Sequence, residues 1–121
     1  MAEFAPVISD RYPYLDVLVT IRGWHERISA LIDTGFTGNL VLPSSLLSPE
    51  IGLPDGRIEW QLADESLVTA PLYLGDIEIL GIPVISASSV TFLGSDFIVG
   101  RGIVDRFKVT LDHGERVIVE P

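Results

Sequence analysis

The chain contains no cysteine. It therefore cannot form a disulfide, bind a metal through thiolates or use a cysteine nucleophile. Nothing in the composition points to an oxidising compartment, so we expect a cytoplasmic protein. Histidine is almost as scarce, and the two residues, His25 and His113, lie far apart with no close carboxylate pattern between them. A zinc site needs several such ligands together, so we expect no metal and no other cofactor.

Basic residues are also few. Eight Lys and Arg stand against 17 Asp and Glu, which gives a formal net charge of −9. This charge repels phosphate backbones and anionic lipid surfaces, so neither nucleic acid nor a membrane is an expected partner. No apolar run is long enough to span a bilayer, and residues 1–6 have neither the basic start nor the apolar core of a secretory signal.

The length and the overall composition are those of one globular domain. At 121 residues the chain can build a single hydrophobic core but not two lobes. Hydrophobic residues make up 47% and charged residues 21%, which is ordinary for a folded protein. We therefore expect one domain over residues 1–121.

Short alternating or β-branched segments, separated by Gly, Pro and Asp, dominate the chain. They predict strands over residues 15–21, 26–32, 40–42, 57–62, 67–74, 77–80, 82–86, 97–99, 108–111 and 116–119. The segments 57–62 and 67–74 form a predicted hairpin with residues 64–66 at its exposed tip, and Gly75-Asp76 is expected to start a further turn.

A helix is expected at one place. Ile103, Val104 and Phe107 share one helical face, which predicts one or two helical turns after Gly100. The predicted fold class is therefore all-β, with one short helix near the C-terminus.

The best functional clue is the segment that follows the apolar run 28–32. The run reads as a buried strand that ends at Asp33, and Thr34 and Gly35 then begin a glycine-rich turn. As a bare tripeptide, Asp-Thr-Gly is most often an ordinary loop. Here a second apolar segment, 40–43, follows the turn, so the aspartate lies between two buried strands instead of on a solvated hairpin tip.

With these pieces in place, the chain resembles the retropepsin-like aspartic proteases, in particular their small single-lobe members from bacteria and archaea. The resemblance rests on the strand into Asp33-Thr34-Gly35, the following Phe36-Thr37-Gly38, the mid-chain hairpin and the late segment Phe97-Ile98-Val99-Gly100-Arg101. These motifs cover nearly the whole chain.

The resemblance implies a closed β-barrel and an active homodimer with one aspartate from each subunit. By the same resemblance, the catalytic residues are Asp33, Thr34, which braces the active-site loops, and Gly35, which lets the substrate backbone approach. The hairpin tip would be a flap, and Phe36, Asp64, Glu65 and Ser66 are the expected substrate contacts. The expected partners are a protein or peptide substrate and a second copy of the chain.

Three features depart from the family pattern. Pepsin-like enzymes have a serine after Asp-Thr-Gly, where this chain has Phe36. In many relatives an acidic or amide residue follows the arginine of the late motif, where this chain has Gly102. The flap tip also has Asp64 and Glu65 in place of the glycines of viral relatives, which places negative charge at the tip.

Three functional readings remain open at this point. The first is an aspartic endopeptidase that hydrolyses peptide bonds with water activated by paired Asp33 carboxylates. The second is a non-catalytic dimer of the same fold that binds extended peptides or serves in assembly. The third is a β-barrel domain with an accidental Asp-Thr-Gly, which predicts a monomer. The endopeptidase and the binding module differ at Asp33, because only the binding module tolerates asparagine there.

Overall fold

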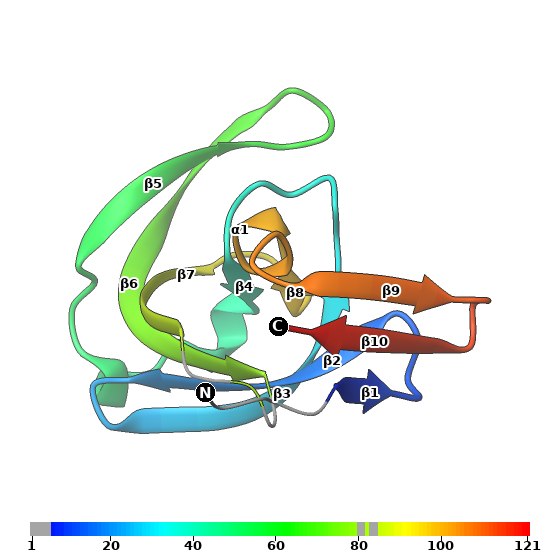
Figure 1. The fold of residues 1–121 in the computed structure, drawn as a ribbon. Helices are drawn as coiled ribbons and strands as arrows, with labels where there is room; N and C mark the ends of the chain where they lie inside the picture. The colour runs from blue at the N-terminus through cyan, green and yellow to red at the C-terminus, as the bar shows by residue number, and fades with distance from the viewer. Residues whose placement is uncertain (1–5, 80–81, 83–84) are drawn as a thin grey trace.

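A computed structural model describes residues 6–79, 82 and 85–121, and strands dominate this part of the chain (Figure 1). The strands are β1 (Val7–Ser9), β2 (Tyr14–Ile21), β3 (Trp24–Ile32), β4 (Leu40–Leu42), β5 (Gly56–Gln61), β6 (Leu67–Ile79), β7 (Ile85–Phe92), β8 (Ile98–Val99), β9 (Lys108–Asp112) and β10 (Arg116–Glu120). The helix α1 covers Arg101–Val104, and two 3₁₀ turns cover Ser44–Leu46 and Pro49–Ile51. The all-β class and the short helix are confirmed.

Six strands close into a barrel. The order is β2-β3-β8-β4-β7-β6, and antiparallel pairing of β6 with β2 closes the ring. The alternation along β2 explains its place, because Leu15, Val17, Val19 and Ile21 are all buried in the barrel core. Burying each such side chain contributes about 1.5–3 kcal/mol relative to exposure. The closed β-barrel expected from the resemblance is confirmed.

A second sheet, in the order β1-β10-β9, lies beside the barrel (Figure 1). It contains the predicted closing hairpin, β9 and β10, and Val117 and Val119 of β10 are fully buried against the barrel core. The strand β1 was not expected, because three residues next to Pro6 carry too short a pattern to be recognised.

The predicted turn at Gly75-Asp76 is wrong, because β6 continues through it to Ile79. The register between β6 and β7 shifts between Gly75 and Ile77, which is a β-bulge. A Cβ on Gly75 would lie 2.7 Å from the carbonyl oxygen of Thr20, so the glycine allows β6 to approach β2. This glycine therefore serves barrel closure and not chain reversal.

The predicted strands 77–80 and 82–86 fall partly outside the described residues, which do not include 80, 81, 83 and 84. Of the first segment, 77–79 belong to β6, and of the second, Ile85 and Ser86 begin β7. None of the helices in the described ranges is long and apolar enough to cross a membrane.

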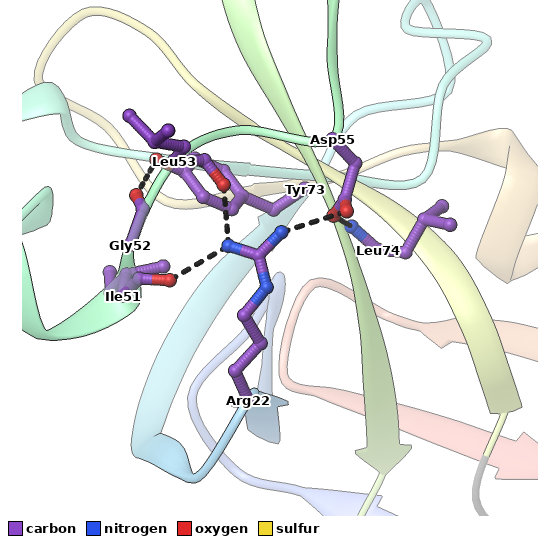
Figure 2. A network of polar contacts seen from close by, with 7 residues as sticks. All are labelled: Arg22, Ile51, Gly52, Leu53, Asp55, Tyr73 and Leu74. Carbon is purple, nitrogen blue, oxygen red and sulfur yellow. Dashed lines mark hydrogen bonds and ion pairs between the residues drawn. The ribbon is translucent and has the colours of Figure 1, made fainter.

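A polar network fastens the base of the β5–β6 hairpin to the turn between β2 and β3 (Figure 2). The guanidinium of Arg22 donates to the carbonyl oxygens of Ile51 (2.9 Å) and Leu53 and pairs with Asp55 at 2.8 Å. The other carboxylate oxygen of Asp55 accepts from the backbone N–H of Leu74 on β6, also at 2.8 Å. Three segments distant in sequence are thus joined where the hairpin leaves the barrel.

Candidate active site

The backbone of Asp33 is fixed at the end of two central strands. Strand β3 pairs in parallel with β8, with Leu31 opposite Ile98 and Ile32 opposite Val99. The N–H of Asp33 donates to the carbonyl oxygen of Val99 at 3.0 Å and continues this pairing by one residue. The sequence signal for this position is the apolar run that ends at Asp33, and the structure places that end beside the end of β8.

The side chain of Asp33 is half-buried, and its Oδ1 accepts the backbone N–H of Gly35 at 2.9 Å. This is the only hydrogen bond to the carboxylate within the described residues. A Cβ on Gly35 would lie 3.1 Å from the same oxygen, so glycine leaves room for the close approach. Thr34 and Gly35 are themselves exposed beside the carboxylate. One oxygen of Asp33 is therefore oriented by the turn.

The loop after Asp33 is tied to the start of α1. The N–H groups of Gly100, Arg101 and Gly102 donate to the carbonyl oxygens of Asn39, Phe36 and Gly38, at 2.8, 2.8 and 3.0 Å. A Cβ on Gly100 would lie 2.3 Å from the carbonyl oxygen of Gly38, which no side chain permits. The late motif therefore supports the loop that holds the aspartate.

The structure also explains Gly102. A Cβ there would lie 1.9 Å from Oδ1 of Asn39, so the Asn39 amide fills the space that a side chain at 102 would need. The same amide donates through Nδ2 to Oγ of Ser89 on β7 at 3.0 Å. An amide is thus present beside Gly102, but it belongs to Asn39 in the loop after Asp33 and not to a residue of α1.

A cavity of about 240 Å³ opens beside Asp33. It is lined by Asp33, Phe36, Val41, Trp60, Gln61, Leu62, Leu93, Gly94, Ser95, Asp96 and Ile98. Phe36 and Trp60 form one wall, with ring centroids 4.9 Å apart and the planes tilted by 58°. Trp60 lies on β5, so this contact brings the hairpin onto the loop of Asp33, over which it arches in Figure 1.

Comparison with known proteins assigns the architecture. No family model and no curated protein matches the chain. Among solved structures, a match is the crystal structure of a retropepsin-like aspartic protease from Rickettsia conorii, with a TM-score of 0.63 and 14% sequence identity. The match covers 98% of this chain and 93% of that one. The chain has a retropepsin-like fold.

Within this retropepsin-like fold, the predicted site residues fall into two groups. Asp33 and Phe36 line the cavity, and Thr34 and Gly35 flank it in the same turn. Asp64, Glu65 and Ser66 form the exposed hairpin tip and do not line the cavity. Instead the hairpin contributes Trp60, Gln61 and Leu62.

The tip has a defined turn structure. The carboxylate of Asp64 accepts the hydroxyl and the backbone N–H of Ser66, and these bonds hold the pKa of Asp64 below its usual value. Glu65 has a φ of 70°, in the left-handed region. The tip thus carries an ionised, internally bonded carboxylate at neutral pH.

Trp60, Asp96 and Leu93 were not expected at the site. The alternation in β5 predicts that Trp60 shares a face with Ile58, but it does not say that this face meets the Asp33 loop. Asp96 lies in a short polar segment between two apolar ones, which is typical of any turn. The pairing of β3 with β8, the strand that follows this turn, brings it to Asp33.

Proposed function

We propose that this chain is an aspartic endopeptidase that acts as a homodimer, with residues 1–121 as one domain in each subunit and one Asp33 from each. The observation that carries the proposal is the Asp33 carboxylate at the rim of a largely apolar cavity, with one oxygen oriented by the N–H of Gly35. The likeness in fold to a structure described as an aspartic protease supports it.

The chemistry requires two carboxylates. Two such groups about 3 Å apart, as in aspartic proteases generally, cannot both be ionised. They therefore share one proton. The ionised partner accepts a proton from a bound water while the protonated partner donates to the carbonyl oxygen of the scissile peptide. General acid–base catalysis of this kind contributes about 10²–10⁴-fold to the rate. A two-fold axis through the site supplies both roles from Asp33 alone.

The substrate would be an extended peptide. A segment placed between the Asp33 turn and the β5–β6 hairpin can add main-chain hydrogen bonds as a further strand, while its side chains enter the cavity. Phe36 and Trp60 offer an apolar surface for such a side chain. By this proposal Thr34 braces the paired turns, and the tip residues 64–66 close over the peptide.

The test is cleavage of a defined peptide mixture by the purified chain, read by mass spectrometry. The proposal expects specific internal cleavage by the wild type, and a loss of at least about 100-fold in Asp33→Asn, because the acid–base group is removed. The matched control is Asp76→Asn, an exposed aspartate opposite Thr20 at the barrel end away from Asp33. Binding without cleavage by the wild type would favour the peptide-binding module instead.

A further inference from the structure

Asp96 lies at a junction of two cavities. It is exposed in the loop between β7 and β8 and lines the cavity that contains Asp33 and Trp60. It also lines a second cavity of about 220 Å³, together with Tyr14, Ser29, Leu31, Ser95 and Phe97. A group bound in either cavity therefore meets the same carboxylate.

The cavity that contains Asp33 and Trp60 combines apolar walls with negative charge. Of the described residues that line it, the charged ones are Asp33 and Asp96, and none is Lys or Arg. In the described part of the chain, Asp96 forms no ion pair and accepts no hydrogen bond from a side chain, so no cation of the chain itself neutralises it. Asp33 has one oxygen engaged by Gly35 and, in the proposed dyad, shares a proton. The uncommitted charge in this cavity is that of Asp96.

We propose that Asp96 selects substrates with an arginine or lysine side chain close to the scissile bond, an inference that rests on the proposed endopeptidase function. A long basic side chain suits both the aromatic walls of this cavity and its carboxylate. Its methylene stem packs on Phe36, its cationic head lies near the face of Trp60, and the head pairs with Asp96. Because Asp33 lines the same cavity, the selected residue lies near the bond that is cleaved.

The experiment compares two peptides that differ only by arginine or norleucine, with this residue moved one position at a time around the cleavage site. The measured quantity is the ratio of kcat/KM for arginine over norleucine. At one position we expect a ratio of about ten in the wild type, since a charge-assisted hydrogen bond is gained. Asp96→Asn should bring the ratio toward one, and high salt should lower it in the wild type. Asp76→Asn is the matched control and should leave the ratio unchanged.

A second arm makes the result independent of catalysis. Binding of the same peptides to Asp33→Asn, measured by calorimetry, should show the same preference for arginine and its loss in Asp33→Asn combined with Asp96→Asn. The charge reversal Asp96→Lys should favour a glutamate peptide. Equal ratios in wild type and Asp96→Asn, or an equal loss of cleavage of both peptides, would overturn the inference while leaving the endopeptidase standing. Absence of cleavage by the wild type would overturn the proposed function, and the binding arm would still decide the role of Asp96.

Discussion

Trp60 and Trp24 are the two tryptophans of the chain, and they lie in different surroundings. Trp24 packs against the core with its ring 6.4 Å from that of Phe92, whereas Trp60 lines the cavity and contacts Phe36. A tilted aromatic pair contributes about 0.5–1.5 kcal/mol beyond its buried area. The Phe36–Trp60 contact therefore helps to hold the hairpin near Asp33, and it makes Trp60 a reporter of the cavity.

We expect a peptide ligand to change the fluorescence of Trp60 but not of Trp24. In Trp24→Phe the remaining indole is Trp60, and a bound peptide would displace water from its ring, so emission should shift to shorter wavelength. In Trp60→Phe the same peptide should leave emission unchanged. Titration of both variants, each combined with Asp33→Asn to prevent cleavage, measures this. A response confined to Trp60→Phe would contradict the assignment of the cavity as the binding site.

The β5–β6 hairpin depends on its anchor as well as on its own pairing. Arg22 sits in the β2–β3 turn with a φ of 50°, and its guanidinium lies 5.5 Å from the ring centroid of Tyr73 while it bonds the segment that leads into β5. The Tyr73 hydroxyl donates to the carbonyl oxygen of Gly52 at 2.8 Å. The barrel thus fixes where the hairpin begins, and the hairpin's free end carries Trp60 to the site.

Removing the Arg22 guanidinium should loosen the hairpin more than the rest of the fold. For Arg22→Met we expect the free energy of unfolding to fall by about 1 kcal/mol, because half-exposed charged hydrogen bonds are lost. Amide hydrogen exchange should accelerate in Gly56–Gln61 more than in Arg116–Glu120. Arg27→Met, an exposed arginine on β3, is the control. Equal acceleration in both segments would show that Arg22 supports the whole barrel instead of the hairpin base.

The same anchor should make stability depend on pH. The hydrogen bond from the backbone N–H of Leu74 is the main cause that holds the pKa of Asp55 below its ordinary value of 3.8; desolvation opposes it, and the charge and hydrogen bond of Arg22 lower the pKa further. Because the folded pKa is the lower one, this stabilisation is present above pH 3.8 and is lost as the pH falls through the folded value. The stability difference between wild type and Asp55→Asn should therefore shrink from pH 6 to pH 2.5 in urea unfolding. Arg22→Met, which keeps the Leu74 bond, should lose only part of this dependence.

Local patterns predict most of these elements but not how they meet. Period-two alternation predicts β2, β3, β5 and the first part of β6, and the apolar run before Asp33 predicts where the carboxylate lies. The same rules misread Gly75, because close approach to Thr20 and a chain reversal both favour glycine. Asp96 lines the Asp33 cavity because strands far apart in sequence pair with each other. Such pairing has no local signature in the sequence.

For the whole molecule, the decisive feature is that the retropepsin-like barrel carries one Asp-Thr-Gly. Among the described residues, the only other carboxylate that lines the Asp33 cavity is that of Asp96. A dyad therefore has two possible sources, a second Asp33 across a two-fold axis or Asp96 within one chain. The exposed turn of Thr34 and Gly35 leaves Asp33 accessible to a partner, which favours the first source.

Mixing wild-type and Asp33→Asn chains distinguishes the two sources. If each active site needs two copies of Asp33, only dimers of two wild-type chains cleave, and activity follows the square of the wild-type fraction. At about half wild type, roughly a quarter of the activity should then remain, by random pairing in a two-fold dimer. A site within one chain, such as Asp33 with Asp96, would leave about half.

The substitution is nearly isosteric, but replacing a shared-proton pair by an amide can change the affinity between subunits. Subunit exchange must therefore be measured on differently tagged chains in the same mixtures. As the matched control, wild-type chains mixed with Asp76→Asn chains should keep an activity proportional to the total chain concentration. With random exchange established, a quadratic curve requires that both carboxylates come from Asp33. A linear curve under the same conditions would contradict the shared dyad, while the retropepsin-like fold, which rests on the strand pairing and the structural match, would stand.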